Sequence, residues 1–143
     1  MKDASKIYAV IDTNVIVSAL LTSNKDSNTN QVVQAINIGN IIPMYNDEIE
    51  SEYKRVLHYP KLKIPEEQIK TFILTLRKFG IKVDRTKIDD ETFPDPDDIV
   101  FYEVRMSVDD SYLVTGNQKH FPAKPFIVTP TQMVEILRER KLI

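Results

Sequence analysis

Three carboxylates occur within four residues in the segment Asp95-Pro96-Asp97-Asp98. One interpretation is a helix start, since Asp95 suits the N-cap, Pro96 the first helical position and further acids the first turn. Three carboxylates are nevertheless more negative charge than capping needs, and a bound divalent cation relieves the repulsion among them. The segment alone leaves both interpretations open.

Two more polar residues follow apolar runs that are typical of buried parallel strands. Asp12 comes directly after IYAVI, and Asn117 lies two residues beyond SYLVT. Ligands of open parallel sheets bind outside the carboxyl ends of the strands, where the strand order reverses. If these two strands are neighbours, Asp12 and Asn117 open into one crevice. Taken singly, Asp12 is better explained as a helix cap and Asn117 as a turn residue.

The segment DEIESEYKRVLHY, residues 47–59, predicts an amphipathic helix with several acids. Its apolar stripe consists of Ile49, Tyr53, Val56 and Leu57. Glu50 and Glu52 flank this stripe on opposite sides, while Glu48 lies further round. Either flanking residue could point into a crevice at the sheet edge. Periodicity does not choose between them, and a solvated helix face explains each one singly.

The elements that must position these residues alternate between strand and helix. Apolar runs predict strands at 7–11, 41–45, 81–83, 111–115 and 126–129. Helices are expected at 15–21, 31–38 and 65–80, from a cap at Asn46 or Asp47 to about Tyr59, after Asp98, and from Pro130 onward. Such alternation means a parallel sheet with helices on both faces. Residues 1–143 are therefore expected to form a single α/β domain.

Composition excludes several classes of protein. The 143 residues include no cysteine, which removes thiolate metal sites and cysteine nucleophiles and is compatible with a cytoplasmic protein. The three glycines permit neither a dinucleotide-binding G-x-G-x-x-G motif nor a P-loop. No apolar run approaches the ~20 residues of a membrane span, and MKDASK does not resemble a signal peptide. The net charge of −2 does not by itself indicate a nucleic-acid-binding protein.

Four segments together resemble the PIN-domain family, the nuclease-like domain of many bacterial toxin–antitoxin toxins. They are VIDTNVIVSAL (10–20), EYKRVL (52–57), DPDDIVFYEV (95–104) and YLVTGNQKHFP (112–122). They occur in the order of the family and cover essentially the whole chain. The longer matches are most similar to the toxin components. The resemblance implies a three-layer α/β/α sandwich whose five-stranded parallel sheet has the order 3-2-1-4-5, with strands one and four side by side.

The resemblance also implies an acidic centre made of Asp12, Glu52 and Asp98. It thus selects Glu52 over the other flanking glutamate, and Asp98 over the two aspartates before it. Asn117 stands where many members carry a fourth acid. Its amide oxygen could still bind a metal or a metal-bound water, but it contributes no negative charge. His120, three residues on, could assist there, although a lone histidine before Phe-Pro is more often a loop residue.

The chemistry implied is metal-assisted hydrolysis of phosphodiesters. A set of ligands that are all oxygen favours Mg²⁺ or Mn²⁺. The resemblance implies that Asp12, Glu52 and Asp98 hold this ion and that Asn117 takes part in catalysis with them. Asn14, Thr115, Asp95 and His120 are expected to orient the ligands or the substrate. Crowding of the acids is expected to raise the pKa of at least one of them. The basic residues Arg77, Lys78, Lys82, Arg85 and Lys87 either contact phosphates or form a solvated run.

The expected function is therefore a metal-dependent endoribonuclease acting as a toxin. Its expected partners are RNA, a cognate antitoxin and a second copy of the chain, with no membrane. One alternative is a PIN-like domain that cleaves weakly or not at all and binds RNA or a protein. Another is a phosphoacceptor receiver domain, which needs an acidic pair after the first strand and a lysine after the fifth. Only Asp12 and Thr129-Pro130 stand there, so the receiver alternative is weak.

Overall fold

A five-stranded parallel sheet forms the centre of the protein. The computed structural model describes residues 6–143, and expectations about residues 1–5 of MKDASK lie outside that range. The sheet has the order β3-β2-β1-β4-β5, and all its pairings are parallel. Its strands are β1 (Ile7–Ile11), β2 (Ile41–Tyr45), β3 (Ile81–Lys82), β4 (Ser111–Val114) and β5 (Ile127–Val128). The expected order is confirmed, and β1 and β4 are neighbours.

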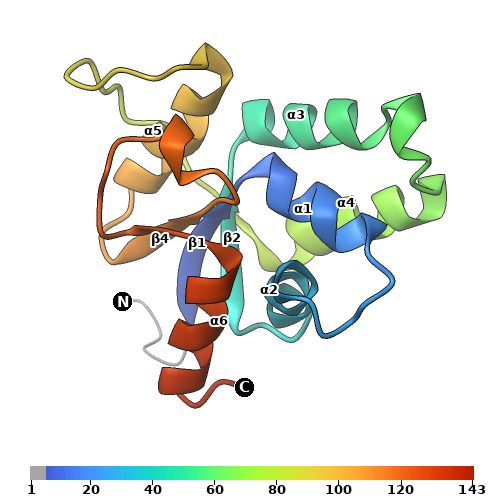
Figure 1. Cartoon of the computed structure of the whole chain (residues 1–143). Coiled ribbons are helices and arrows are strands. Elements are labelled where there is room, and N and C mark those ends of the chain that lie inside the picture. The colour runs from blue at the N-terminus through green and yellow to red at the C-terminus, as the bar shows by residue number, and fades with distance from the viewer. Residues whose placement is uncertain (1–5) are drawn as a thin grey trace.

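Helices cover both faces of this sheet, as Figure 1 shows. In residues 6–143 the α-helices are α1 (Thr13–Leu21), α2 (Asn28–Asn37), α3 (Asp47–Leu57), α4 (Glu66–Phe79), α5 (Ile99–Met106) and α6 (Pro130–Glu139). Helix α5 packs on β1, β2 and β4 from one side, whereas α2 and α6 pack together on the other side with α1 and α4. The result is the expected three-layer α/β/α sandwich.

The core lies between these layers and follows from the apolar runs of the sequence. Ala9, Val10 and Ile11 of β1 are essentially inaccessible, as expected of a strand with a helix layer on each face. The segment after Asp98 is helical, as predicted, and contributes the buried Phe101 to this core. Because the whole apolar run of β1 is buried between the helix layers, the strand ends where the first polar residue, Asp12, follows Ile11.

Turn chemistry defines the ends of several helices. Asn46 caps α3 by accepting a hydrogen bond from the Ile49 amide at 2.9 Å. Gly39 ends α2 with a φ of +84°, a backbone conformation that glycine adopts without strain. Pro65 differs from the expectation, because it is the N-cap of α4 rather than its first helical residue. Gly80 closes α4 where a side chain would meet backbone oxygens, including that of Pro43 at 2.9 Å.

This architecture brings the chemically promising residues to one edge. Because the strands are parallel, Asp12 after β1 and Thr115 after β4 both lie at the carboxyl edge of the sheet. The Asp12 amide donates to the carbonyl oxygen of Val114 at 2.9 Å, which joins the two strand ends directly. None of the helices in residues 6–143 is long and apolar enough to cross a membrane.

Candidate active site

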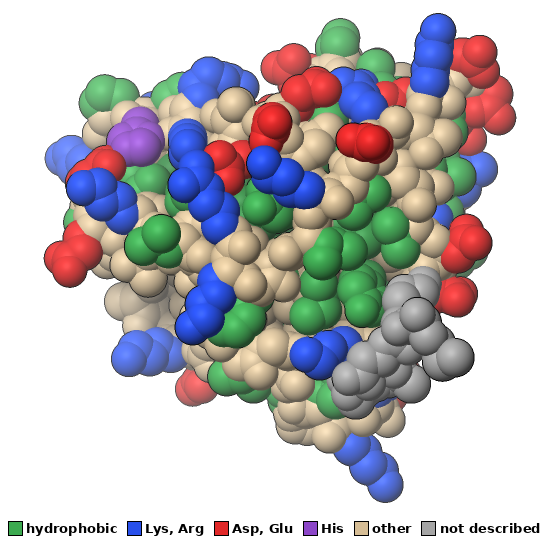
Figure 2. All heavy atoms as spheres, turned by 180° about the vertical axis from the view of Figure 1, so that it is seen from behind, with side chains coloured by type: hydrophobic (Ala, Val, Ile, Leu, Met, Phe, Trp, Pro, Cys, Tyr) green, Lys and Arg blue, Asp and Glu red, His purple; other side chains and the backbone are tan. Residues whose placement is uncertain are grey.

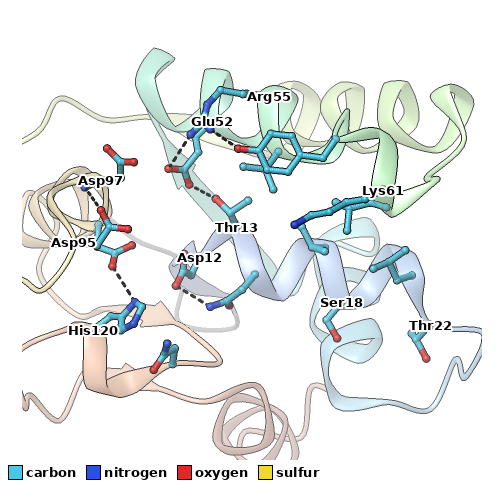
Figure 3. Close-up of a pocket in the computed structure, with 18 residues that line it drawn as sticks. Asp12, Thr13, Ser18, Thr22, Glu52, Arg55, Lys61, Asp95, Asp97 and His120 are labelled. Atoms are coloured by element: carbon cyan, nitrogen blue, oxygen red, sulfur yellow. Dashed lines mark hydrogen bonds and ion pairs between the residues drawn. The ribbon is translucent and has the colours of Figure 1, made fainter.

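A cavity of about 820 Å³ opens at the carboxyl edge of the sheet, between α1, α3 and the turn that precedes α5. Figure 3 shows acidic side chains around one end of it. The residues singled out from the sequence that line this cavity are Asp12, Asn14, Glu52, Asp95, Asp98, Asn117 and His120. Thr115 is fully buried and contacts Asp12. Segments that are far apart in the chain are thus brought together at one site.

Asp12 is held by side chains and does not act as a helix cap. It occupies the N-cap position of α1, but its side chain makes no capping hydrogen bond. Its Oδ2 instead accepts from the Thr115 hydroxyl at 2.7 Å and from the Asn14 amide at 3.3 Å. Burial raises the pKa of Asp12, and the Thr115 hydrogen bond opposes that rise. The capping explanation of the Asp12 side chain is therefore wrong.

Asn14 and Thr115 also connect the two strand ends that flank the crevice. The Asn14 side-chain oxygen accepts from the Gly116 amide at 3.2 Å, and the Thr115 hydroxyl oxygen accepts from the Asn117 amide at 3.0 Å. Each residue therefore contacts Asp12 on one side and the segment after β4 on the other. The arrangement fixes the orientation of Asp12 and the path of the backbone that carries Asn117.

The structure separates the two glutamates that periodicity left open. Glu50 faces α4, where Arg77 donates to both of its oxygens at 2.9 Å, and this pairing lowers the pKa of Glu50 to about 2. Glu52 lines the cavity and accepts a hydrogen bond from the Thr13 hydroxyl. Burial raises the pKa of Glu52, with Asp12 adding to the rise. Glu52 is therefore the cavity residue, and Glu50 is an ion-pair residue.

The Asp95–Asp98 segment combines the two roles that the sequence left undecided. Asp95 caps a single 3-10 turn, Pro96–Asp98, by accepting from the Asp97 amide at 2.9 Å. Asp98 precedes α5 without capping it, and its Oδ2 is a buried atom that accepts no hydrogen bond. The nearby His120 Nδ1 lies 3.3 Å away, a contact that is an ion pair only when the imidazole is protonated. Burial, followed by the charges of Asp12 and Asp95, raises the pKa of Asp98 to about 6.

The donor set fits a hard divalent cation, although the side chains are not gathered tightly. Across residues 6–143 no three aspartate, glutamate or histidine side chains lie close enough together to hold one ion. The expected rise in carboxylate pKa is present, but burial is its largest cause and repulsion is secondary. A buried oxygen of Asp98 that accepts no hydrogen bond, and on which the charges of Asp12 and Asp95 act, is what Mg²⁺ or Mn²⁺ would compensate. The assignment of Asp12, Glu52 and Asp98 as ligands of one ion stays a prediction.

Sequence reasoning missed three residues that shape this site. Thr13 holds Glu52, and it could have been suspected from its place within Asp12-Thr13-Asn14. Arg55 lies 3.7 Å from Glu52, one helical turn away at i+3. The buried Tyr53 donates its hydroxyl to the carbonyl oxygen of Ile11, which anchors α3 to the end of β1. Only the packing of α3 against β1 shows the last of these roles.

A family model described as PIN domain matches residues 8–119, which is most of the chain. The chain belongs to the PIN-domain family. No curated protein matches its sequence closely enough to be named as a relative. PIN domains are generally nucleases that use divalent metal ions, so this fold is of the nuclease type. The matched range of the PIN domain includes Asp12, Glu52, Asp98 and Asn117, and it ends just before His120.

Proposed function

We propose that this PIN domain is an endoribonuclease that hydrolyses RNA phosphodiesters with the help of Mg²⁺ or Mn²⁺. The observation that carries the proposal is the group of carboxylates at one cavity, in which a buried Asp98 oxygen accepts no hydrogen bond. Buried negative charge that lacks a donor is unfavourable, and a bound cation compensates it. Because every side chain proposed as a ligand offers oxygen, the site suits a hard cation better than zinc.

The proposed ligands differ in how they are held. Asp12 is fixed by Thr115 and Asn14, whose hydrogen bonds to Oδ2 favour its ionised form. Glu52 is fixed by Thr13, whereas Asp98 has no hydrogen-bond donor at its buried oxygen. A divalent cation bound there would neutralise charge on the phosphate and lower the pKa of a water molecule. The side chains of the protein would hold that cation at the strand ends.

The decisive experiment is cleavage of an RNA panel by purified protein with Mg²⁺, with Mn²⁺ or with EDTA. Asp12→Asn should abolish cleavage, because it removes the charge of the most firmly held ligand. Both metals should also raise the melting temperature of the wild type, since an ion that binds only the folded state stabilises it. Wild-type protein that is folded and binds metal but leaves the whole panel intact would contradict the proposed activity.

A binding role without cleavage is the second candidate, and one observation favours it. Asn117 lines the cavity where a fourth acid would add negative charge, and the acids of the described chain are not gathered tightly. Affinity for RNA that persists in EDTA, without cleavage in either metal, would support this candidate over the nuclease.

The biological role that we propose is that of a toxin with a cognate antitoxin. The longer of the four matching segments, which are most similar to toxin components, support it, and a second copy of the chain in a homodimer is proposed on the same basis. Growth arrest on expression of the wild type, but not of Asp12→Asn, would be the expected result in cells. Size-exclusion chromatography with light scattering would test the homodimer.

A further inference from the structure

The basic residues that the sequence offered for phosphate binding are largely engaged elsewhere. Arg77, Lys82 and Arg85 form ion pairs with Glu50, Asp47 and Glu48 of α3, respectively. Arg85 also donates to the buried Glu103 of α5 at 2.6 Å. On the face drawn in Figure 2, acidic and basic side chains are intermixed near the top. Three of the five offered basic residues are thus already paired, and the cavity itself offers other positive charge.

The cavity has a second end that is basic and aromatic. It extends along α1 from the acidic residues to the C-terminal end of α3 and the turn that follows, where Arg55, Tyr59 and Lys61 line it. The Lys61 ammonium group forms no ion pair or hydrogen bond with any residue of the described range 6–143, and Figure 3 shows its side chain extending over the cavity toward α1. Arg55 donates to the Tyr59 hydroxyl at 2.6 Å, which orients the phenol ring.

We propose that Arg55, Tyr59 and Lys61 form a subsite for the nucleotide that flanks the scissile bond in a single-stranded RNA. The inference rests on the proposed nuclease function and adds to it the residues that hold the RNA strand beside the acidic centre. In this subsite Lys61 and Arg55 contact a phosphate, and the ring of Tyr59 stacks on a base. Cations that track the backbone beside an aromatic ring are the usual means of holding a single strand.

The walls of this end suit an unpaired base. The apolar side chains that line it are Val17, Leu21, Val56 and Leu62. Leu21 is 49% exposed and Tyr59 is 36% exposed, so both keep apolar surface open to a ligand. A base within a duplex is stacked between its neighbours and cannot present a face to such a wall, which is why we infer a single strand.

The charge pattern along the cavity supports the same occupant. At the acidic end, the carboxylates repel a phosphate unless a cation is bound between them. At the other end, Lys61 is free to pair with a phosphate, and Arg55 is 56% exposed despite its 3.7 Å contact with Glu52. An RNA strand thus has an attractive contact on one side of the acids, which anchors it while the adjacent linkage reaches the acidic centre.

The test is binding of a short, fluorescently labelled single-stranded RNA, measured by anisotropy in EDTA so that metal-dependent cleavage cannot occur. Lys61→Gln should weaken binding on the order of fivefold. It should also reduce the slope of log affinity against log salt by about 0.7, the value for one lost phosphate contact on a single strand. Lys63→Gln is the matched control, because Lys63 is exposed two residues away and does not line the cavity.

Two further comparisons make the inference specific. Tyr59→Leu should weaken binding of the single strand, and Tyr59→Phe should restore most of it, because phenylalanine keeps the ring. An RNA duplex of the same sequence should bind more weakly than the single strand. The subsite is refuted if Lys61→Gln binds as tightly as Lys63→Gln, if the duplex binds equally well, or if the wild type does not bind the single strand. Unchanged binding by Lys61→Gln with intact cleavage would refute the subsite alone, whereas binding without cleavage in Mg²⁺ or Mn²⁺ would refute only the nuclease.

Discussion

The hydroxyl of Thr13 donates a hydrogen bond to the carboxylate of Glu52 and so joins the start of α1 to the middle of α3. The two residues are 39 positions apart in the chain. Asp12, next to Thr13, is held from the other side by Thr115 of the segment after β4. Two carboxylates of the candidate site, Glu52 and Asp12, are therefore held by hydroxyl groups from α1 and from the segment after β4.

Replacing Thr13 with valine tests that relationship. Thr13→Val keeps the shape of the side chain but removes the donor, so the pKa of Glu52, which this hydrogen bond lowers, should rise further. We expect a loss of about 1–2 kcal/mol in the free energy of unfolding, and weaker binding of Mg²⁺ or Mn²⁺ by about tenfold or more. NMR titration of the Glu52 carboxyl carbon and calorimetric metal titration would measure both effects. Thr13→Ser should behave like the wild type, and an unchanged Glu52 pKa in Thr13→Val would contradict the expectation.

Asp98→Asn should stabilise the protein in the absence of metal. The folded-state pKa of Asp98 is raised to about 6 from an ordinary value of 3.8. Stability contributed by its protonated form is therefore complete below about pH 4 and is lost as pH rises through about 6. In EDTA at pH 8 the variant should be more stable by about 1 kcal/mol, after allowance for solvent screening, and it should lack this pH dependence.

Asp97→Asn is the matched control for that experiment, because it removes the same charge from an exposed position in the same turn. It should change the stability and its pH profile much less than Asp98→Asn does, because Asp97 is exposed and its charge contributes only a minor part of the raised pKa of Glu52. Denaturation in urea from pH 4 to 8 provides the measurement. The metal-induced rise in melting temperature should also be largely lost in Asp98→Asn and kept in Asp97→Asn. A destabilised Asp98→Asn protein would mean that Asp98 serves the helix start and not the cavity.

Glu50 and Glu52 should respond differently to the same substitution. Glu50→Gln breaks the ion pairs with Arg77 and Lys54 and should destabilise the protein by about 1 kcal/mol while leaving its metal response intact. Because the pKa of Glu50 is lowered to about 2, this contribution is present above its ordinary value of 4.5 and disappears as pH falls toward 2. Glu52→Gln should fold normally and lose its metal response. Thermal melts with and without Mn²⁺ would distinguish the two variants. Loss of the metal response in Glu50→Gln, with the response kept in Glu52→Gln, would mean that Glu50 is the metal ligand.

Asn117→Asp should strengthen the proposed metal centre. An added carboxylate at a partly dry site favours a dication, so the Kd for Mn²⁺ should fall on the order of tenfold and cleavage should become faster. Without metal the variant should be slightly less stable, because four acids then repel one another. Asn24→Asp adds the same charge in an exposed loop outside the cavity and should alter neither property. Slower cleavage together with weaker metal binding in Asn117→Asp would show that the amide itself is needed.

Much of the fold could be predicted from local patterns alone. The apolar runs of β1 and β2 were located to the residue, because a strand buried on both faces must be continuously apolar. Pro130 marked the start of α6 and occupies its first turn, and the structure adds a capping box formed by Thr129 and Gln132. Pro65 was placed one position too far into α4, because proline fits both the cap and the first turn. Helix ends are decided by single hydrogen bonds, which local patterns define only approximately.

The residue types of the candidate site could be predicted from the sequence, but the directions in which their side chains point follow from the tertiary structure. Asp12 and the segment Asp95–Asp98 could be singled out as candidates because acids after a buried strand and before a helix are conspicuous, and the family resemblance then selected Asp98. Periodicity could not tell Glu52 from Glu50, since both flank the same apolar stripe. The family resemblance selected Glu52, and the packing of α3 between α1 and α4 gives the physical reason: Glu50 pairs with Arg77, and Glu52 faces Thr13 and the cavity. The sequence determined which groups are present, and contacts between distant segments decided which of them face one another.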